Sequence, residues 1–312
     1  MIVLRRLPWA LPAALFVFLC LVNALLQPSF LKPAVMASNL ATFLPLAIIA
    51  VGQTYVILGG SIDLSLGAIV SLVNVVVVGV VEATGAFVWA LPAGIAAGLA
   101  VGAVCGTLNG VVLGVLRLQP IVTTFASSIV FGGVALWVRP EAGGALPDVY
   151  FELYAGTVLG VATPLLVLAL VLATTALLSR TRFYTYLLAT GGGQQAAFQT
   201  GLPVRGVRVA SHALAGLFAA LAALCVLGET AAGDPLMGQA FTLTSVSAVV
   251  LGCTSLSGGA GTVAGSVLGA VVIGLINNVI FFAKLPFVYQ SMVQGLIILA
   301  ALAGGVLVTR RP

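Results

Sequence analysis

The chain has 312 residues, of which 61% are hydrophobic and only 6% are charged, whereas an ordinary soluble domain is about 25% charged. Such a composition cannot solvate a soluble fold, so it excludes a soluble domain and indicates a protein of the lipid bilayer. The formal net charge is +5. The basic residues stand singly or in pairs between apolar runs, which indicates membrane topology rather than a nucleic-acid partner.

Charged residues, prolines and glycine clusters divide the chain into apolar segments, and a membrane crossing takes about 20 such residues. We expect an all-α polytopic membrane protein with about ten transmembrane helices, in a single domain over residues 1–312. The fourth segment is long for one helix and contains Gly102 and Gly106, and the eighth is a candidate for a broken or re-entrant helix. The expected spans are 8–26, 40–59, 64–81, 86–116, 121–138, 157–178, 209–228, 242–257, 262–283 and 287–308.

The charges sort cleanly onto the two sides of this topology when the N-terminus is placed inside. The expected cytoplasmic basic residues are Arg5, Arg6, Arg117, Arg180, Arg182, Arg205, Arg208, Arg310 and Arg311, against Lys32, Arg139 and Lys284 outside. The acidic residues Glu82, Glu141, Asp148, Glu152, Glu229 and Asp234 all fall outside. Because cytoplasmic loops carry the excess of Lys and Arg, we expect both termini in the cytoplasm, with Leu7 to Val22 in the first span rather than in a cleaved signal.

A weak internal repeat relates the two halves of the chain. Asn109 precedes an apolar stretch, the run Arg117 to Pro120 and another span, and Asn278 precedes an apolar stretch, the run Lys284 to Pro286 and another span. The expected topology puts Arg117 inside and Lys284 outside, which is the relation of inverted repeats in transporters. The alternative is chance, because Asn, Gly and Pro recur in any polytopic protein.

Catalytic chemistry has little support in the sequence. There is no Gly-x-x-x-x-Gly-Lys-Ser/Thr motif to bind nucleotide phosphates, so we expect no cofactor on this chain and no ATP hydrolysis by it. The one histidine, His212, reads as a helix-end or core residue, because no Ser-His-Asp or metal-ligand arrangement can be assembled around it. Cys20, Cys105, Cys225 and Cys253 lie far apart in apolar segments and form neither a disulfide framework nor a metal site.

The run Gly52 to Gly67 contains Gly-Gly-Ser-Ile-Asp-Leu-Ser-Leu-Gly. Four further stretches follow it along the chain: Gly106 to Gly110 with Leu118 to Thr124, Gln195 to Gly201, Gly233 to Gln239, and Val249 to Asn278. In this order the five stretches resemble the ribose/xylose-type permeases of bacterial ABC importers, whose signature is Gly-Gly-Ile-Asp-Leu-Ser-Val-Gly. Three positions depart from the family pattern by losing a charge, at Gln195, Ala260 and the run Thr242 to Thr244, which favours a divergent paralogue or an unusual substrate.

The resemblance implies a type II ABC importer permease fold in the bacterial inner membrane. It implies a chain that translocates a small sugar or sugar-like solute, delivered by a periplasmic binding protein. It also implies a second permease copy, identical or a paralogue, and cytoplasmic ATPase subunits that hold the ATP and magnesium. A secondary transporter or channel driven by an ion gradient is the alternative function, although Asp63 is the one intramembrane carboxylate that could couple an ion. A membrane-embedded enzyme is a third possibility.

Polar residues and glycines inside the apolar spans are the candidates for the translocation pathway. Asp63 is the strongest single candidate, because an ionisable group at membrane depth is costly and so indicates a function. The alternative, which we favour, is that Asp63 caps the N-terminus of the next helix. Buried amides must find partners, and interhelical hydrogen bonds are their commoner use. The candidates are Asp63, Asn109, Asn277, Asn278, Gly258 and Gly259.

The segment 179–208 is the longest expected cytoplasmic loop. Glycines at 191–193 precede a helix-compatible run from Gln194 to Thr200, and Gly201 ends it as a helix C-cap would. The resemblance implies that this short helix couples the permease to the ATPase, with Phe198 as the one large apolar side chain for a partner's groove. A solvated loop is the alternative. The candidate coupling residues are Gln194, Gln195, Ala196, Ala197, Phe198 and Gly201.

Most of the acidic residues gather in two outer segments, Arg139 to Glu152 and Glu229 to Asp234. Charges at the rim of an interface steer the encounter between partners. We therefore expect these segments to contact the binding protein, with Glu229, Asp234, Glu141 and Asp148 as the docking candidates. Solvation alone would also explain their position.

Overall fold

The computed structural model describes residues 10–286 except 86, 87 and 145, together with residues 289, 292, 293, 295, 296 and 299. The described chain is helical apart from one two-stranded hairpin. In the first half the helices are α2 (Ala10–Leu26), α3 (Pro33–Leu58), α4 (Leu66–Thr84), α5 (Ala90–Val111), the π-helical turn η1 (Val112–Leu116), α6 (Pro120–Val138) and α7 (Asp148–Ala155). The hairpin of β1 (Thr157–Val158) and β2 (Val161–Ala162) follows, then α8 (Thr163–Ser179), α9 (Arg182–Gly192), α10 (Gln194–Gln199), α11 (Val204–Thr230), the 3₁₀ turn η2 (Met237–Ala240), α12 (Phe241–Leu251) and α13 (Val263–Phe282).

The described helices confirm a multi-span α-helical membrane protein but not the count of ten spans. Six helices are long and apolar enough to cross a bilayer, and α8 and α9 would add a seventh if this pair, bent by 76°, forms one span. These six are α3, α4, α5 with η1, α6, α11 and α13. The expected span 287–308 lies outside the described residues apart from isolated positions.

The eighth expected span is broken. The 11 residues of α12 rise about 16 Å, far less than the roughly 30 Å of the hydrocarbon core. The irregular segment before α12 lies along α4, where Asn74 Oδ1 accepts the Asp234 N–H at 2.7 Å and Ser71 Oγ accepts the Gly238 N–H at 2.9 Å. Polar side chains of α4 thus satisfy non-helical backbone groups that lipid could not satisfy.

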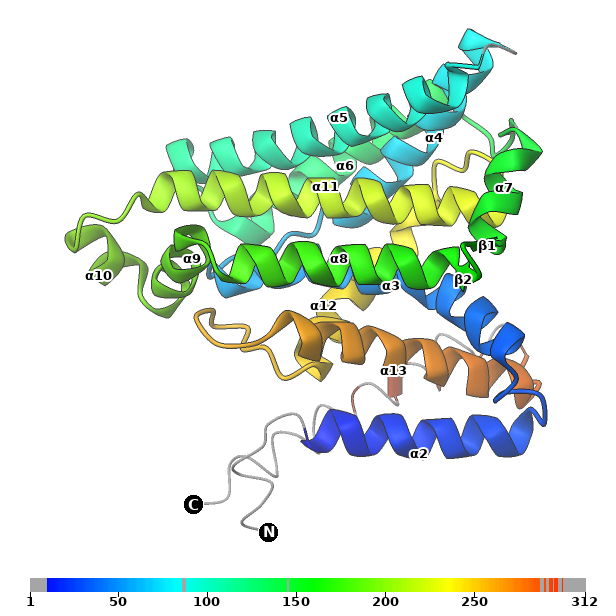
Figure 1. The fold of residues 1–312 in the computed structure, drawn as a ribbon. Helices are drawn as coiled ribbons and strands as arrows, with labels where there is room; N and C mark the ends of the chain where they lie inside the picture. Colours follow the sequence, from blue (N-terminus) through cyan, green and yellow to red (C-terminus); the bar gives the residue numbers. More distant parts are fainter. Residues whose placement is uncertain are drawn as a thin grey trace.

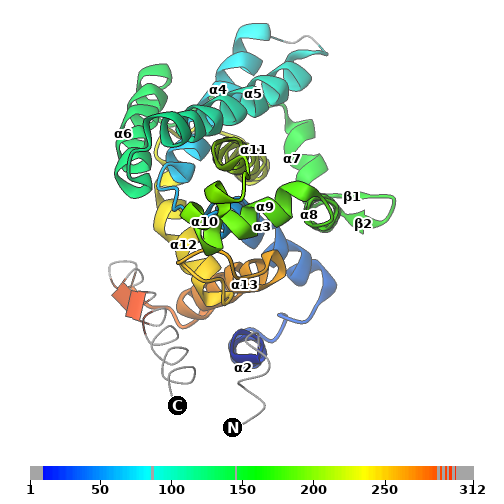
Figure 2. The ribbon, with the colours of Figure 1, turned by 90° about the vertical axis from the view of Figure 1, so that its left-hand side faces the viewer.

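A glycine stripe on α5 lets α11 take the centre of the fold. Glycines recur every four residues along this helix, and the last three, Gly102, Gly106 and Gly110, face α11. A Cβ on Gly102 would lie 2.7 Å from Ala220 Cβ, and one on Gly110 would lie 2.6 Å from Val209 Cα. Small residues at this spacing allow close backbone approach between membrane helices. Figure 2 shows α11 enclosed by α3, α5 and their neighbours.

A second cluster lies on the other face of α3. There α13 packs against α2, α3 and α12, with Phe43, Ala47 and Ile273 in its core. The ring of Phe43 fills the space left by Gly274, and Asn23 of α2 donates to the Leu275 carbonyl at 3.2 Å. Figure 1 shows α2 and α13 side by side along one flank of the bundle.

Several boundaries differ from the sequence expectation. The expected span 157–178 begins only at Thr163, because its first residues form the β1–β2 hairpin. Helix α3 starts at Pro33, where proline suits the first turn of a helix, and so begins seven residues before the expected 40. Helix α7 was not expected, because its polar residues were assigned to an outer loop.

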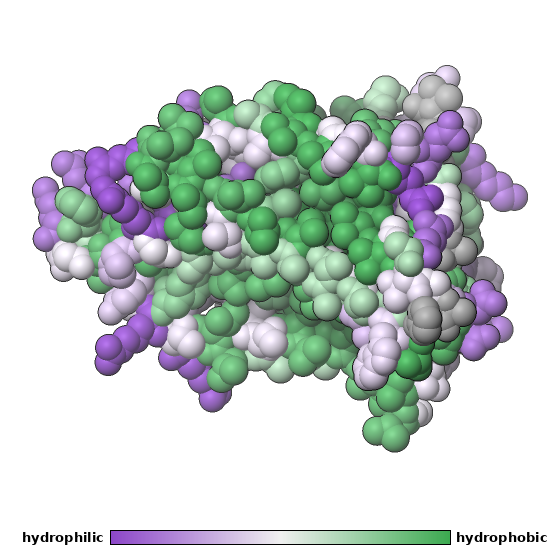
Figure 3. Space-filling model, turned by 90° about the horizontal axis from the view of Figure 1, so that it is seen from above, coloured by the Kyte–Doolittle hydropathy of each residue, from purple (hydrophilic) through white to green (hydrophobic). Residues whose placement is uncertain are grey.

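Charge separates the two ends of the bundle. One end carries α9 and α10 with Arg117, Arg180, Arg182, Arg205 and Arg208, and we call it the arginine end. The opposite end carries α7 and the hairpin with all the acidic residues except the fully buried Asp63, and we call it the acidic end. Apolar surface covers the middle of the molecule, and hydrophilic residues gather toward the two ends (Figure 3).

Candidate functional site

The arginine end contains a helix that the sequence did not predict. Helix α9 lies in the segment expected to be an open loop, and its Leu187 is fully buried. Its Phe183 and Tyr184 rings lie 6.5 Å from the Tyr55 ring of α3, which in turn stacks on Phe218 of α11 at 6.1 Å. Aromatic pairs at such separations stabilise a contact beyond area burial, so α9 is fixed to the bundle.

The predicted short helix after the glycines is confirmed, and α10 runs from Gln194 to Gln199. Its end has the two hydrogen bonds of a Schellman motif, with Gly201 N–H donating to Phe198 O at 3.0 Å and Leu202 N–H donating to Ala197 O at 3.1 Å. Gly201 has a φ of +81°, a left-handed conformation that favours glycine. Gly201 therefore terminates α10 as expected.

The three apolar residues of α10 do not share one exposed face. Ala197 is buried and attaches α10 to the rest of the chain, whereas Ala196 is exposed and Phe198 is 65% exposed. Gln194 accepts a hydrogen bond from Arg208 Nη2 at 2.6 Å, and Gln195 is exposed. Phe198 is thus the apolar side chain of α10 that a partner could contact, and Ala197 is not.

Gly258 and Gly259 pack into a glycine junction rather than facing open space. This glycine junction consists of Gly60, Gly191, Gly192, Gly258 and Gly259. Gly259 N–H donates to the Leu58 carbonyl at 3.0 Å, and a Cβ on Gly258 would lie 2.9 Å from Gly60 Cα. A Cβ on Gly191 would overlap the Leu58 carbonyl oxygen. Backbone contacts therefore join the end of α9 to the end of α3 and to the loop that precedes α13.

Asp63 organises the start of α4 without being its N-cap residue. Ser65 holds that position, and Asp63 Oδ1 accepts both the Ser65 N–H at 2.8 Å and the Ser65 Oγ–H at 2.6 Å. Ser65 Oγ also accepts a hydrogen bond from Asn109 Nδ2 at 2.7 Å. Asp63 thus positions the N-cap residue of α4 instead of capping the helix itself, as the sequence had suggested. Two pathway candidates, Asp63 and Asn109, are brought together through Ser65.

His212 belongs to the same buried region, which the sequence did not reveal. Its Nδ1–H donates to the Arg208 carbonyl at 2.9 Å, and Nε2 has no hydrogen-bond partner. The residue interacts electrostatically with Asp63, whose Oδ2 is also unpaired. His212 and Asp63 are both fully buried. Two unpaired polar atoms in a buried region mark it as a place where a polar group could bind.

The other asparagine candidates lie elsewhere. Asn278 donates to Asn39 Oδ1 at 3.0 Å and so joins α13 to α3, which is the commoner use of a buried amide. Asn277 is exposed on the surface of α13. Neither is hydrogen-bonded to the Asp63 region, so the six pathway candidates do not form one site.

The acidic end joins the two outer segments into one surface. Gly143 and Gly233 exchange backbone hydrogen bonds of 2.8 and 2.9 Å, and Leu146 N–H donates to Ala231 O at 3.0 Å. Glu141 and Asp148 are exposed there, while Asp234 Oδ1 accepts the Leu236 N–H at 2.8 Å and stabilises a turn.

Glu229 differs from the other acidic residues of this end. It is half-buried, accepts a hydrogen bond from Thr42 at 3.0 Å, and lines a cavity of about 450 Å³ between α3, α7 and the start of α8. Among the described residues no cation pairs with it. Glu229 is therefore less accessible to a large partner than Glu141 and Asp148.

Comparison with known proteins identifies a family across nearly the whole chain. The family model described as "Branched-chain amino acid transport system / permease component" matches residues 35–302. The ribose import permease protein RbsC of Bacillus subtilis is 35% identical over 292 residues, covering 92% of this chain and 89% of that protein. RbsC of Escherichia coli K12 is 33% identical over 298 residues, with 92% and 90% covered.

The name of a third relative refers to L-arabinose instead of ribose. The L-arabinose ABC transporter permease protein AraH of Azospirillum brasilense is 31% identical over 290 residues, covering 92% of this chain and 84% of that protein. No solved structure matches the chain. The described helices and the apolar surface around the middle of the molecule fit a membrane-embedded protein, as these similarities also indicate. The chain belongs to this family of permease components, which are the membrane-embedded transport subunits of ABC importers.

Proposed function

We propose that this chain translocates a small sugar, of about the size of a pentose, as the permease subunit of an ATP-driven importer. The similarity to two ribose permeases and an arabinose permease, over 92% of the chain in each case, carries this proposal. ATP and magnesium belong to the partner ATPase, because the chain lacks a phosphate-binding loop. We also propose that residues 1–312 form a single transmembrane permease domain.

The arginine end is proposed to face the cytoplasm, with both termini on that side. The five described arginines of that end have no acidic neighbour in sequence or at that end, and the excess of Arg and Lys on the cytoplasmic side sets the orientation of membrane proteins. The ATPase subunits would then meet α10, where Phe198 is exposed. The glycine junction supports a coupling role, because it joins the α9–α10 segment to α3 and α13 through backbone contacts.

The acidic end is proposed to receive the periplasmic binding protein. Its two outer segments form one surface through the Gly143–Gly233 pairing, which supports a shared partner. Glu141 and Asp148 are the more accessible contacts, and Glu229 and Asp234 support the surface from within. A second permease copy, identical or a paralogue, completes the proposed importer. The exposed apolar side chains of α6, among them Phe125 and Ile129, support such a contact.

The pathway is proposed to pass beside Asp63 and Asn109. The unpaired Asp63 Oδ2 and His212 Nε2 support this placement, because they are buried polar atoms that a hydroxylated solute could satisfy. Asn277, Asn278, Gly258 and Gly259 are proposed to shape the helices around the pathway.

Reconstitution tests the proposed function directly. The permease, its ATPase and its binding protein are placed in proteoliposomes, and uptake of labelled ribose and arabinose is measured with ATP, without ATP and with an imposed ion gradient. Uptake that needs ATP and both partners is expected. Uptake that an ion gradient alone supports would favour the secondary transporter instead.

A further inference from the structure

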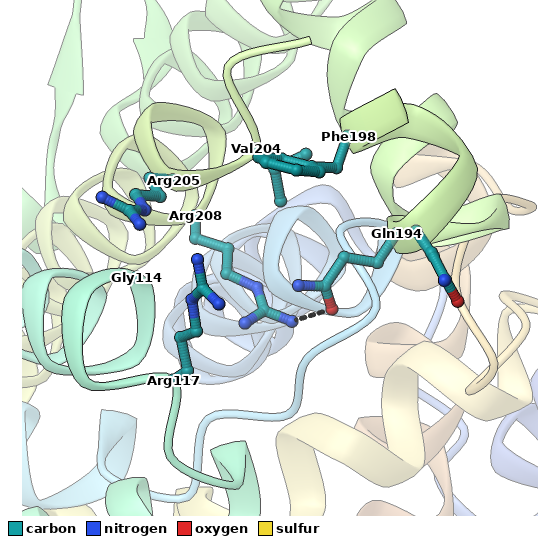
Figure 4. A pocket seen from close by; sticks show the side chains of 8 residues that line it. Gly114, Arg117, Gln194, Phe198, Val204, Arg205 and Arg208 are labelled. Atoms are coloured by element: carbon teal, nitrogen blue, oxygen red, sulfur yellow. Dashed lines mark hydrogen bonds between the residues drawn. The ribbon is translucent and has the colours of Figure 1, made fainter. Parts of the chain in front are cut away.

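A cavity at the arginine end lies between the end of η1 and the consecutive elements α10 and α11, which are far from η1 in the sequence. Its volume is about 320 Å³, and it is lined by the end of η1, by α10 and by the start of α11 (Figure 4). Arg117 from the η1 side and Arg208 from α11 lie close to each other there, and Arg205 of α11 lines the cavity with its guanidinium group apart from these two. Phe198 and Val204 lie against each other at one side of it. Asp63, Asn109 and His212 do not line this cavity.

The charges in this cavity are not balanced. Three guanidinium groups line it, and no acidic residue does. The ion pair found among the described residues, Arg139 with Glu82, is at the acidic end. Arg208 donates one hydrogen bond to Gln194, but its Nε is buried without an acceptor. Like charges in a partly enclosed space repel one another, so the arrangement favours binding of an anion.

The backbone around the cavity also favours an anion. Arg117 has a φ of +55°, a left-handed conformation that costs energy for a residue with a Cβ and is enriched at functional sites. It follows directly on a π-helical turn, another feature frequent at such sites. The 27-residue helix α11 begins at Val204 without a side-chain cap, so the positive end of its dipole adds to the arginines.

The position of the cavity indicates what kind of anion it meets. Val115, Leu116 and Leu118 flank Arg117 and are 59%, 62% and 50% exposed. Val115 and Leu116 end a helix long enough to span the bilayer and Leu118 follows it, so these exposed apolar side chains belong in contact with acyl chains. Arg117 therefore lies where the apolar belt meets the headgroup region.

We propose that this arginine cavity binds the phosphate group of an anionic phospholipid. A phosphate presents several oxygens to planar guanidinium forks, and basic pockets between membrane helices suit lipid headgroups. The rim of exposed leucine and valine accommodates the acyl chains, which a free phosphate ion lacks. Because Arg208 also holds Gln194, the bound lipid stabilises the position of α10 relative to α5 and α11.

The test measures lipid binding to the delipidated, full-length chain in detergent by native mass spectrometry and by thermal unfolding. The probes are phosphatidylglycerol, phosphatidylcholine and inorganic phosphate. Phosphatidylglycerol is expected to bind at least tenfold more tightly than phosphatidylcholine and to raise the unfolding temperature, and inorganic phosphate at the same concentration is expected to have little effect. The double variant Arg117→Gln/Arg205→Gln should lose at least tenfold in affinity for phosphatidylglycerol.

The matched control is Arg180→Gln/Arg182→Gln, which removes the same charge from exposed arginines of the same end that do not line the cavity. The control should keep its affinity within about twofold. Equal binding of the two lipids, or equal losses in the two double variants, would overturn the proposal. Protection by inorganic phosphate as strong as by the lipid would replace the lipid with a free anion.

One other outcome also overturns the proposal. If the cavity variant keeps its lipid but no longer retains the ATPase subunits, the arginines bind an acidic side chain of that partner. Should the double variant not fold, the headgroup preference of the unaltered chain and the single Arg117→Lys variant decide the matter. The lysine keeps the charge but not the guanidinium fork, so a several-fold loss of phosphatidylglycerol affinity is expected, and an unchanged affinity contradicts the model.

Discussion

Each end of the bundle carries a short helix, and the two helices are attached in different ways. At the acidic end, Tyr150 donates to the Leu224 carbonyl at 2.8 Å and Tyr154 donates to the Ala41 carbonyl at 3.1 Å, so α7 is anchored by two hydrogen-bonded rings. Burial raises the pKa of both phenols, which therefore remain neutral donors. At the arginine end, α10 has one buried side chain, Ala197, and one side-chain hydrogen bond to the bundle.

This difference indicates that α7 is part of a fixed docking surface, whereas α10 can transmit a movement to the bundle. Side chains from α7 fill the space over Gly228 and hold the acidic end to α3 and α11. The α9–α10 segment is attached to the bundle by the side chains of α9 and also at the glycine junction, where backbone touches backbone. A push on α10 would therefore pass to α3 and to the loop before α13. The difference suits a docking surface at one end and a coupling helix at the other.

The glycine junction gives the largest expected effect. A Cβ on Gly191 would overlap the Leu58 carbonyl oxygen and lie 2.6 Å from Gly259 N. Overpacking costs about 1 to 3 kcal/mol and more where backbone cannot yield, so Gly191→Ala should abolish uptake and lower the yield of folded protein. Gly192→Ala is the matched control, because its Cβ would meet nothing within 4 Å. Equal behaviour of the two variants would show that the junction is not a tight contact.

Phe198→Ala should lower transport while leaving the permease folded. The side chain is 65% exposed, and an aromatic anchor at an interface contributes about 2 kcal/mol, which is roughly a 30-fold loss of affinity. ATPase co-purification and uptake should fall together, with an unchanged unfolding temperature. Gln199→Ala, an exposed neighbour on the same helix, is the control. Normal uptake by Phe198→Ala at normal expression would show that α10 is a solvated surface element and not the coupling helix.

Charge reversal of Glu141 and Asp148 should act at the other end and more weakly. Both side chains are exposed, and rim charges mainly steer encounter. The binding-protein concentration for half-maximal uptake should rise several-fold at low salt. The effect should shrink as ionic strength increases, and the maximal rate should stay unchanged. A loss that does not depend on salt would exclude electrostatic docking.

Tyr154→Phe is expected to have the smallest effect. The ring still fills the space at Gly228, but the hydrogen bond to Ala41 is lost. A typical hydrogen bond contributes about 1 kcal/mol, so the unfolding temperature should fall by a few degrees. ATPase binding should be unaffected. Tyr186→Phe is the control, because its hydroxyl has no hydrogen-bond partner among the described residues, and an equal shift in both variants would contradict the anchoring role.

Local signals in the sequence were enough to predict α10 and its end. The glycines at 191–193 and at Gly201 act within a few residues, and the left-handed φ of Gly201 is a local requirement. The Asp63–Ser65 turn is local in the same way. By contrast, α9 was missed because its buried face depends on Tyr55 of a distant helix. Phe183 to Leu188 carried the only signal, an apolar run inside an otherwise polar loop.

The candidate sites required knowledge of which helices touch. Gly258 and Gly259 looked like exposed backbone in the sequence, but their neighbours are Gly60, Gly191 and Gly192, up to about 200 residues away along the chain. His212 of α11 interacts with Asp63, which is far from it along the chain. The arginine cavity likewise depends on η1 ending at Arg117, where no glycine or asparagine marks the left-handed turn.

Arg117 and Lys284 offer partial support for the inverted repeat. Both have a left-handed φ, of +55° and +56°, and each precedes a proline that begins the next segment. They lie at opposite ends of the bundle, as an inverted relation requires.

Photocrosslinking in the assembled importer would test the division between the two ends most directly. A benzoylphenylalanine is introduced at Phe198 in one variant and at Asp148 in another, and each complex is irradiated with ATPase and binding protein present. We expect position 198 to crosslink to the ATPase alone and position 148 to the binding protein alone. Crosslinks from position 198 to the binding protein, or from position 148 to the ATPase, would contradict the proposed orientation and the coupling role of α10.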